Sequence, residues 1–215
     1  MSRMAEHADT PTSRLDRRKE RTRRALIDAA RRILAERGTT DVSIQEITDT
    51  ADLGFGTFYN HFDTKTALFE VAVGEVLEEY GAALDLACAE LDDSAEIYAV
   101  GVRMTARLAA TRPAVAQVLV QVGLTYAWAE QGLAARALRD IRRGIADGRF
   151  TIDDARLGLL STAGCVLAFI TWSLERPNEL SEADADHLAE MLLRMLGMTP
   201  RAAANVAHRP LPTIS

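Results

Sequence analysis

The 215-residue sequence predicts an all-α protein with two domains, an N-terminal three-helix helix-turn-helix domain and a C-terminal helical bundle, with about nine helices in all. Three observations carry this prediction. Apolar residues recur at intervals of three and four along most of the chain, as they do on amphipathic helices. No segment alternates apolar and polar residues as a half-buried strand does. A short helix, a three-residue turn and a second short helix can be recognised within residues 43–62.

The first helix is expected over residues 16–36, after a flexible arm at residues 1–15. Leu26, Ala30 and Ile33 fall on one face of this helix because they are spaced by three and four residues. A glycine two residues beyond the helix ends it, since glycine readily adopts the left-handed conformation found at helix C-termini.

Residues 43–62 carry the helix-turn-helix pattern. Ser43 and Glu46 form an S-x-x-E capping box that opens its first short helix. The turn residues 52–54, Asp-Leu-Gly, end that helix because Asp and Gly tolerate a left-handed backbone. The second short helix would bury Phe58 and Phe62, which are four residues apart. Its other side is left to Phe55, Thr57, Tyr59, Asn60 and His61. A short helix with such a free side suits a recognition helix, which enters the major groove of DNA.

The remaining helices are placed by caps and helix stops. Thr64 is expected to cap a helix that runs to about residue 91, long enough to link the two domains. Further helices are expected over about 95–111, 113–126 or 128, 132–148, 154–176 and 181–197. The predicted domains are the arm at 1–15, the DNA-binding domain at 16–64, the second domain at 65–198 and a disordered tail at 199–215.

The charge of the chain is unevenly distributed, although its net value is −6. Residues 13–37 hold ten Lys or Arg and four Asp or Glu, a net charge of +6. Residues 66–215 hold 13 basic and 20 acidic residues, a net charge of −7. A basic N-terminal end on an acidic body favours a protein that meets DNA with one end only.

A resemblance to a known family rests on the recognition segment. The run Gly-Thr-Phe-Tyr-Asn-His-Phe at residues 56–62, followed by Lys65 and Leu68, resembles the signature of TetR-type transcriptional regulators. Residues 21–30 resemble the first helix of the same family, and the similarity is specific over roughly residues 18–70.

The chain departs from that pattern at two positions. Asp52 stands where the turn usually carries Gly, and Gly54 stands where a small polar cap is usual. Gly is an N-cap only a few tenths of a kcal/mol worse than Ser, so the motif is still expected to fold. A side-chain phosphate contact at position 54 is lost.

The resemblance and the side-chain chemistry together predict two kinds of DNA contact. Polar groups at helix starts and on the recognition helix suit phosphate oxygens: Thr22, Ser43, Tyr59, His61 and Lys65. Asn can bind adenine through two hydrogen bonds, and Phe and the Thr methyl group suit thymine methyls. Base reading is therefore expected from Phe55, Gly56, Thr57 and Asn60. The alternatives are that Phe55 packs against the turn and that His61 forms a structural bond within the domain.

The sequence offers no catalytic, metal or cofactor site. Cys88 and Cys165 are too far apart in sequence for a metal-binding pattern and are expected to be buried thiols in a reducing cytosol. The four histidines are scattered, and Asp184 and His187 are expected to form a solvated pair. The first fifteen residues lack an apolar stretch, so no signal peptide is expected. The protein is predicted to be cytoplasmic and not an enzyme.

Residues 157–174 contain no charge and are long enough to suggest a transmembrane helix. Serines, threonines and glycines within the stretch and the absence of basic or aromatic flanks favour instead a buried helix of a soluble oligomer, with no membrane partner. Small residues on one face would let a second helix approach closely. The predicted homodimer interface is Gly158, Ser161, Gly164, Ala168, Leu188, Met191, Leu192 and Met195. Packing within one chain is the alternative.

Large or polarisable side chains in the second domain suggest a ligand pocket, which the family resemblance also implies. The predicted lining is Cys88, Met104, Gln121, Tyr126, Trp128, Cys165 and Phe169. Its few charges predict a small, largely apolar effector, with Arg103 as the most plausible partner for an anion. Ordinary core packing of these side chains is the alternative.

These observations predict a ligand-responsive repressor that binds a palindromic double-stranded operator as a homodimer. Two other functions remain open. The chain could be a helical small-molecule-binding protein with a vestigial helix-turn-helix, or a DNA-bound regulator without an effector.

Overall fold

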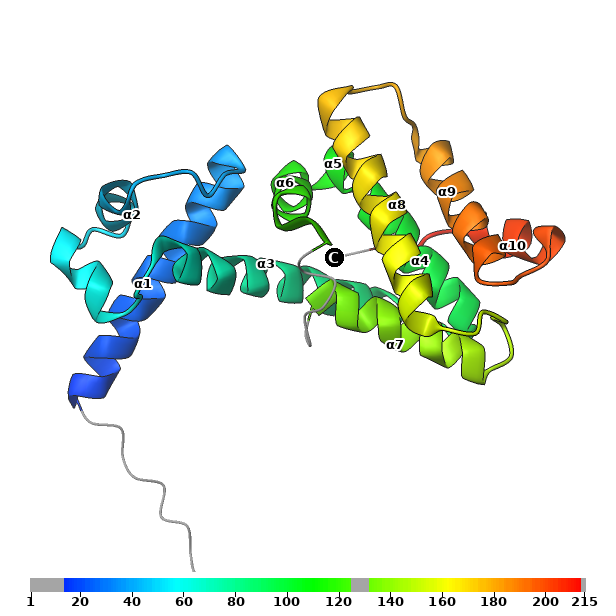
Figure 1. Ribbon diagram of the computed structural model, residues 1–215, viewed down its shortest axis with the longest axis horizontal. Coiled ribbons are helices and arrows are strands. Elements are labelled where there is room, and N and C mark those ends of the chain that lie inside the picture. Colours follow the sequence, from blue (N-terminus) through cyan, green and yellow to red (C-terminus); the bar gives the residue numbers. More distant parts are fainter. Residues whose placement is uncertain (1–13, 125–131, 214–215) are drawn as a thin grey trace, which may run out of the picture.

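The computed structural model describes residues 14–124 and 132–213, and there the chain is all-α, as predicted. In Figure 1 a small head, made of α1, α2, η1 and the first half of α3, lies at one end, and α3 runs from it into a bundle made of α4 to α10. The helices are α1 (Arg14–Arg37), α2 (Ile44–Thr50), the 3₁₀ helix η1 (Phe55–Asn60), α3 (Lys65–Ala87), α4 (Ser94–Ala106), α5 (Leu108–Thr111), α6 (Pro113–Val122), α7 (Gly132–Ala146), α8 (Ala155–Glu175), α9 (Glu182–Met195) and α10 (Pro200–Ala207).

The head is held together by apolar side chains from each of its helices. Leu26 and Ile33 of α1 meet Ile47 of α2, Phe58 of η1 and Leu68 of α3, and all five are buried. Burying a side chain of this size contributes roughly 1.5–3 kcal/mol. Helices as short as α2 and η1 are not stable alone, so this shared core holds them in place.

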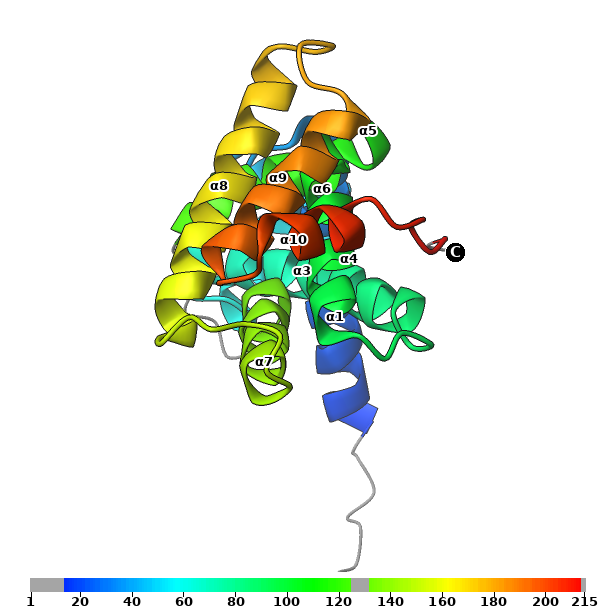
Figure 2. The same cartoon turned by 90° about the vertical axis from the view of Figure 1, so that its right-hand side faces the viewer.

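The bundle is built around α4, which contacts α7, α8, α9 and α10. Tyr98 and Val102 of α4 are buried in this core, and the Tyr98 ring packs edge-on against Phe150. Figure 2 shows α8 along one edge of the bundle with α9 and α10 beside it. The helix predicted over residues 95–111 is divided at Arg107, which forms ion pairs with Asp186 and Glu182 of α9.

The predicted disordered tail at residues 199–215 is wrong over its first half. Residues Pro200–Ala207 form α10, and Ala203, Val206 and Ala207 are buried against the bundle. Thr199 caps this helix by accepting a hydrogen bond from the Ala202 amide at 3.4 Å. The Thr-Pro pair looks like a helix stop in the sequence, but Pro at the first position of a helix is favoured because its missing N–H is not needed there.

The predicted flexible arm is also shorter than expected at its inner end, because α1 already begins at Arg14. Residues 1–13 lie outside the described residues.

Within the described residues, α8 is the one helix long and apolar enough to cross a membrane by length and composition, with a mean hydropathy of 1.8 over its most apolar window. Only 28% of that window is buried in the single chain. A core helix of a soluble protein passes the same test, so this is weak evidence for a membrane span.

Candidate functional site

The turn of the head is built by short-range hydrogen bonds. The Ser43 hydroxyl accepts from the Glu46 amide at 3.2 Å, and the Glu46 carboxylate accepts from the Ser43 amide at 2.8 Å, which completes the predicted capping box. The bonds that the Glu46 carboxylate accepts from the Ser43 amide, the Ser43 hydroxyl at 2.9 Å and Arg37 at 3.0 Å lower the pKa of Glu46 to about 2. Asp52 adopts a left-handed backbone with φ of 55°, the conformation expected at the turn.

The candidate recognition element η1 presents one buried side and one free side. Phe58 is buried, whereas Phe55 is 47% exposed and Tyr59 is 53% exposed. The Tyr59 ring lies edge-on between the rings of Phe58 and Phe55, at centroid distances of 5.4 and 5.9 Å. Gly56 and Asn60 are exposed beside them, and Thr57 is half-buried. The free side of η1 thus combines two rings with an amide and an open backbone.

His61 and Lys65 lie at the edge of this surface. Burial lowers the pKa of His61, and the charges of Lys19 and Arg23 lower it further, which favours the neutral ring. Its Nδ1 atom is buried and has no hydrogen-bond partner among the described residues. The Lys65 ammonium donates to the Val42 carbonyl at 2.8 Å, which ties the start of α3 to the segment before α2.

Two of the three hydroxyl groups predicted to contact phosphates, those of Thr22 and Ser43, already have partners within the head. Thr22 donates to the Arg18 carbonyl at 3.0 Å, and Ser43 donates to the Glu46 carboxylate at 2.9 Å. Each hydroxyl would have to exchange or share this bond to reach a phosphate.

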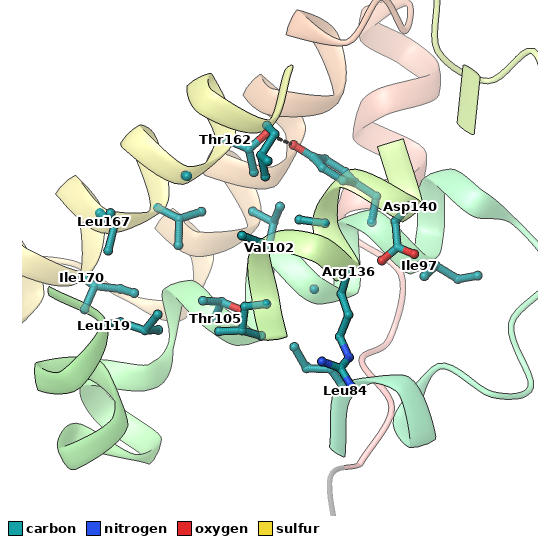
Figure 3. A pocket seen from close by; sticks show the side chains of 18 of the residues that line it. Leu84, Ile97, Val102, Thr105, Leu119, Arg136, Asp140, Thr162, Leu167 and Ile170 are labelled. Carbon is teal, nitrogen blue, oxygen red and sulfur yellow. Dashed lines mark hydrogen bonds between the residues drawn. The ribbon is translucent and has the colours of Figure 1, made fainter. Parts of the chain in front are cut away.

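The bundle contains a cavity of about 140 Å³ that is lined by residues of α3, α4, α6, α7 and α8. Its wall is mostly apolar, with Leu84, Val102, Leu119, Leu159 and Ile170 among its residues. Figure 3 shows these helices around the space and the few polar side chains that reach it. The cavity is smaller than a drug-sized pocket of about 300–1,000 Å³.

Only one predicted pocket residue in the described part of the chain, Cys88, lines this cavity. Burial raises the pKa of Cys88 to about 11, so its thiol stays protonated. Tyr126 and Trp128 lie outside the described residues. The prediction is wrong for this cavity at Met104, Gln121, Cys165 and Phe169, which do not line it.

Helix geometry explains these misses. Gln121 points to the head, where its side-chain amide donates to the Thr40 hydroxyl at 3.0 Å. Met104 packs between the main core and the small cluster formed by Cys88, Ile97 and Val100. Cys165 is exposed in the single chain rather than buried, because it lies on the outer face of α8.

Arg103 does not reach the cavity either. It is buried, forms an ion pair with Asp186 at 2.7 Å and donates to the Arg209 carbonyl at 2.7 Å. It therefore anchors the C-terminal segment on α4 and α9. The charged residues that do line the cavity are Asp85, Arg136 and Asp140, and a buried pair, Tyr98 and Thr162, joins them. The sequence gives little indication that these three charged residues line a cavity, since isolated charges on amphipathic helices usually face solvent.

The outer faces of α8 and α9 expose apolar and small side chains. Leu157 and Trp172 of α8 are 59% and 44% exposed, and Met191 of α9 is 65% exposed. A Cβ atom at Gly164 would have no neighbour within 4 Å, so this face of α8 is open in the single chain. Ser161 and Ala168 are exposed on the same helix, and Met195 is exposed on α9.

Three residues of the predicted interface lie elsewhere. Gly158 is buried inside the chain, where a Cβ atom would lie 3.0 Å from Leu196, and Leu192 is buried in the core of the bundle. Leu188 is half-buried and packs against the core. The correction follows the helical period, because Gly158 and Leu192 share the inner faces of their helices.

The described residues contain no group of three or more His, Cys, Asp or Glu side chains that could hold a metal ion. His187 and His208 stack edge-on at 5.6 Å, and Glu190 lies 3.4 Å from His208.

A helix-turn-helix head on an all-α bundle with an internal cavity defines a DNA-binding transcriptional regulator. Residues 26–72 match the family described as bacterial regulatory proteins, tetR family, and residues 93–209 match the family described as tetracyclin repressor-like, C-terminal domain. The second match alone covers more than half of the chain. The chain belongs to the TetR family of transcriptional regulators.

Solved structures agree with this assignment. The chain is 36% identical to RolR in its complex with the ligand resorcinol, with a TM-score of 0.80 over 93% of this chain and 99% of that one. RolR without ligand gives 35% identity and a TM-score of 0.75 over 89% of this chain and 100% of that one. The HTH-type transcriptional repressor DhaR from Mycobacterium sp. (strain GP1) is 36% identical over 58 residues, which span 27% of each protein.

Proposed function

We propose that this regulator is a cytoplasmic repressor that binds a palindromic operator as a homodimer and releases it when a small single-ring aromatic molecule occupies the cavity. The observation that carries this proposal is the position of α6. One side of α6 lines the cavity through Leu119, and its end contacts the head through Gln121. A ligand that moves α6 can therefore move the head.

The size of the cavity supports a single-ring effector. An engineered apolar cavity of about 150 Å³ is known to bind benzene. The cavity of this chain, about 140 Å³, is close to that size. RolR, which is 36% identical over 93% of this chain, binds resorcinol, a single ring. We therefore narrow the predicted small, largely apolar effector to a molecule with one aromatic ring, similar in size to benzene or resorcinol.

DNA contact is assigned to the free side of η1 and its edges. Phe55, Gly56, Thr57 and Asn60 would read bases, since they face outward or lie at the open side of η1. Phosphates would be bound by Thr22, Ser43, Tyr59, His61 and Lys65. The neutral His61 ring would act as a hydrogen-bond donor through Nε2 rather than as a cation.

The second copy of the chain is assigned to the open faces of α8 and α9. The exposed side chains of α8 recur every three or four residues, at Leu157, Ser161, Cys165, Ala168 and Trp172, so they form one continuous stripe. Pairing this stripe and Met191 with the same residues of a second chain would make a four-helix interface with two-fold symmetry. Two-fold symmetry of the protein implies a palindromic operator.

The link between cavity and head is a small set of contacts between α6 and the segment after α1. Gln121 donates to Thr40 at 3.0 Å. A Cβ atom at Gly38 would lie 1.7 Å from the Gln117 side chain, so Gln117 fills the space left by this glycine. A ligand weakens operator binding only if it binds better to the arrangement whose heads do not fit the operator. The contacts of Gln117 and Gln121 with the segment after α1 would differ between the arrangement that binds the operator and the arrangement that binds the ligand.

The experiment starts with operator selection. DNA selected from a random pool by the full-length protein is expected to contain an enriched inverted repeat, and its absence would contradict the DNA proposal. Resorcinol is then titrated into the complex with the selected site. Operator affinity is expected to fall by roughly 5–150-fold at saturation, and operator DNA must weaken resorcinol binding by the same factor.

The coupling residues are tested by Gln121→Ala. This variant is expected to keep resorcinol affinity and ligand-free operator affinity while losing most of the coupling. Thr111→Ala is the matched control, because Thr111 lies on the neighbouring α5 and its hydroxyl donates to the Arg107 carbonyl, just before that helix, rather than to the head. Equal coupling in both variants would mean that α6 does not transmit the signal through Thr40.

A further inference from the structure

The cavity has two chemically different ends. Figure 3 shows Leu119, Leu167 and Ile170 at one end and Arg136 and Asp140 at the other. Leu119 comes from α6 and the other two apolar residues from α8, whereas both charged residues come from α7. A ring that enters this cavity can bury its unsubstituted edge against Leu119, Leu167 and Ile170 and place a polar substituent near the charged end.

Arg136 is not available to bind an anion at that end. Its two terminal nitrogens donate to Glu78 at 2.8 and 2.6 Å, and its Nε donates to Asp85 at 2.7 Å. The guanidinium is therefore shared between two carboxylates of α3. Such bidentate charge-assisted pairs are strong, so an incoming anion would have to displace them.

The charged end is acidic as a whole. Of the charged side chains that line the cavity there, Asp85 and Asp140 are carboxylates and Arg136 is the guanidinium, so the lining carries a net negative charge when all three are ionised. An anionic substituent placed here would be repelled, and the mostly apolar wall would do little to screen it.

Asp140 is the carboxylate with spare hydrogen-bonding capacity. Its Oδ1 accepts from Arg139 at 2.9 Å, and its Oδ2 accepts no hydrogen bond from any described residue. Burial raises the pKa of Asp140, opposed by the hydrogen bond from Arg139. Asp85 differs, because burial there is outweighed by hydrogen bonds from Arg139 and Arg136, which leave its pKa lowered. Asp140 thus gains more from a new hydrogen-bond donor than Asp85 does.

The buried pair Tyr98 and Thr162 also offers an acceptor. Thr162 donates to the Gly158 carbonyl at 2.7 Å, so the Tyr98 hydroxyl, 2.6 Å from Thr162, must donate to it. A hydroxyl has one donor and two acceptor sites, so Tyr98 keeps only acceptor capacity for a ligand. Thr162 lines the cavity together with Tyr98. Two polar groups of the wall, Asp140 and Tyr98, therefore call for a ligand that donates, whereas the Thr105 hydroxyl, which also lines the cavity, can donate or accept.

We infer that the effector is a neutral ring bearing a hydroxyl group, that Asp140 accepts the hydrogen bond of this hydroxyl, and that rings bearing a carboxylate are rejected. This inference rests on the proposed effector site and names the chemistry that the site selects. The sequence suggested Arg103 as a partner for an anionic group of the ligand, whereas this inference gives the cavity a hydrogen-bond acceptor, Asp140. Asp140 is therefore a residue that determines ligand specificity. A phenolic hydroxyl, with a pKa near 10, is neutral and donates at pH 7.

The test uses three rings of similar size that differ in one substituent: phenol, toluene and benzoate. Each is titrated calorimetrically into the full-length protein at pH 7 without DNA. Phenol is expected to bind at least about ten-fold more tightly than benzoate. Asp140→Asn is expected to weaken phenol binding roughly ten- to a hundred-fold, as the loss of a hydrogen bond to a charged group does. Toluene binding should change less than about two-fold, because toluene cannot donate.

Asp147→Asn is the matched control, because Asp147 is an exposed aspartate just beyond α7 that is paired only with Arg143, at 3.7 Å. It should leave all three affinities unchanged. Benzoate binding as tight as phenol binding would overturn the inference, and so would unchanged phenol affinity in a folded Asp140→Asn variant. If that variant does not fold, the ratio of the affinities of the unmodified protein for phenol and benzoate still tests the inference.

Failure of the inference can be distinguished from failure of the proposed function. If phenol binds as expected but operator affinity does not change, the regulatory proposal fails and the assignment of Asp140 stands. If none of the three rings binds while operator DNA is still bound, the inferred ligand chemistry is wrong and the DNA proposal is untouched.

Discussion

The head and the bundle place their polar groups in opposite ways. In the head, Tyr59 and Asn60 face solvent from a helix of six residues, and the core beneath them is apolar. In the bundle, Tyr98, Arg136 and Asp140 line a cavity, and Tyr98 and Arg136 are held by partners on other helices. A surface that contacts the outside of a large partner such as DNA can be built from one short segment. A cavity that selects a small molecule needs groups from several helices, because it must surround its ligand.

The same contrast appears in the outer face of the bundle. The head exposes aromatic rings beside amide and hydroxyl groups, whereas α8 and α9 expose the large apolar side chains of Leu157, Trp172 and Met191. The first surface suits DNA, and the second suits another apolar surface. Four predictions test this division of roles, from the largest expected effect to the smallest.

The largest effect is expected from Gly164→Arg. A Cβ atom at Gly164 would have no neighbour within 4 Å in the single chain, so the fold of one chain should tolerate the substitution. In the dimer it would place an unpaired charge in an apolar interface, which is strongly unfavourable. Light scattering at micromolar concentration should show a dimer for the unmodified protein and monomer or aggregate for the variant. Ala146→Arg, at an exposed site on α7, should remain dimeric. A dimeric Gly164→Arg variant would exclude this face as the interface.

Phe58→Ala should destabilise the head by about 3–5 kcal/mol, because Phe58 is completely buried and the cavity left behind cannot fill. DNA binding should be lost while light scattering still shows a dimer, since the dimer depends on the bundle. Phe55→Ala, at a residue 47% exposed, should change stability little. If Phe58→Ala and Phe55→Ala lowered the free energy of unfolding equally, as measured with urea, η1 would not have one buried and one free side.

Asn60→Ala should cost about 1–3 kcal/mol of discrimination at one or two base positions. Tyr59→Phe or Lys65→Ala should instead weaken binding to all sites alike and reduce its salt dependence, as the loss of a phosphate contact does. Affinities for a panel of singly substituted operators, measured at several salt concentrations, separate the two patterns. Relaxed base preference in Tyr59→Phe would reverse the assignment.

The smallest effect concerns the capping box of the head. The folded protein holds the pKa of Glu46 at about 2, below its ordinary value of 4.5. A lowered pKa stabilises the folded state above pH 4.5, and this contribution is lost as the pH falls from about 4.5 to about 2. In the Glu46→Gln variant, the melting temperature should therefore fall less steeply between about pH 4.5 and pH 2 than in the unmodified protein. The difference should be small, because the group is exposed. Glu70→Gln, at an exposed glutamate of α3, should leave the decline unchanged.

Reasoning from the sequence worked best where structure depends on neighbours in the chain. The capping box of Ser43 and Glu46, the left-handed turn at Asp52 and the burial of Phe58 all follow from spacings of three or four residues. The disordered tail was wrong because α10 is stabilised by burial of Ala203 and Val206 against the bundle, which the local sequence does not reveal.

The pocket residues show where such reasoning stops. Residue type suggested Phe169 and Cys165, but a helix of the bundle buries only part of its circumference, and the side that faces the cavity depends on where its neighbours lie. Thr162 and Val166 of the same helix α8 line the cavity, whereas Cys165 is exposed. A nearly uniform apolar helix gives no periodic signal to choose between these sides.

The sequence by itself determined the fold class, the helix-turn-helix motif and its family, because these follow from local spacing and from a contiguous signature. The tertiary structure alone decided which side chains meet across the bundle. Asp140 meets an open space rather than solvent, and Arg136 reaches Glu78 and Asp85, because α7 packs against α3 and α4. Burial and pairing are properties of residues far apart in the chain, so the chemistry of the cavity exists only once the helices have packed.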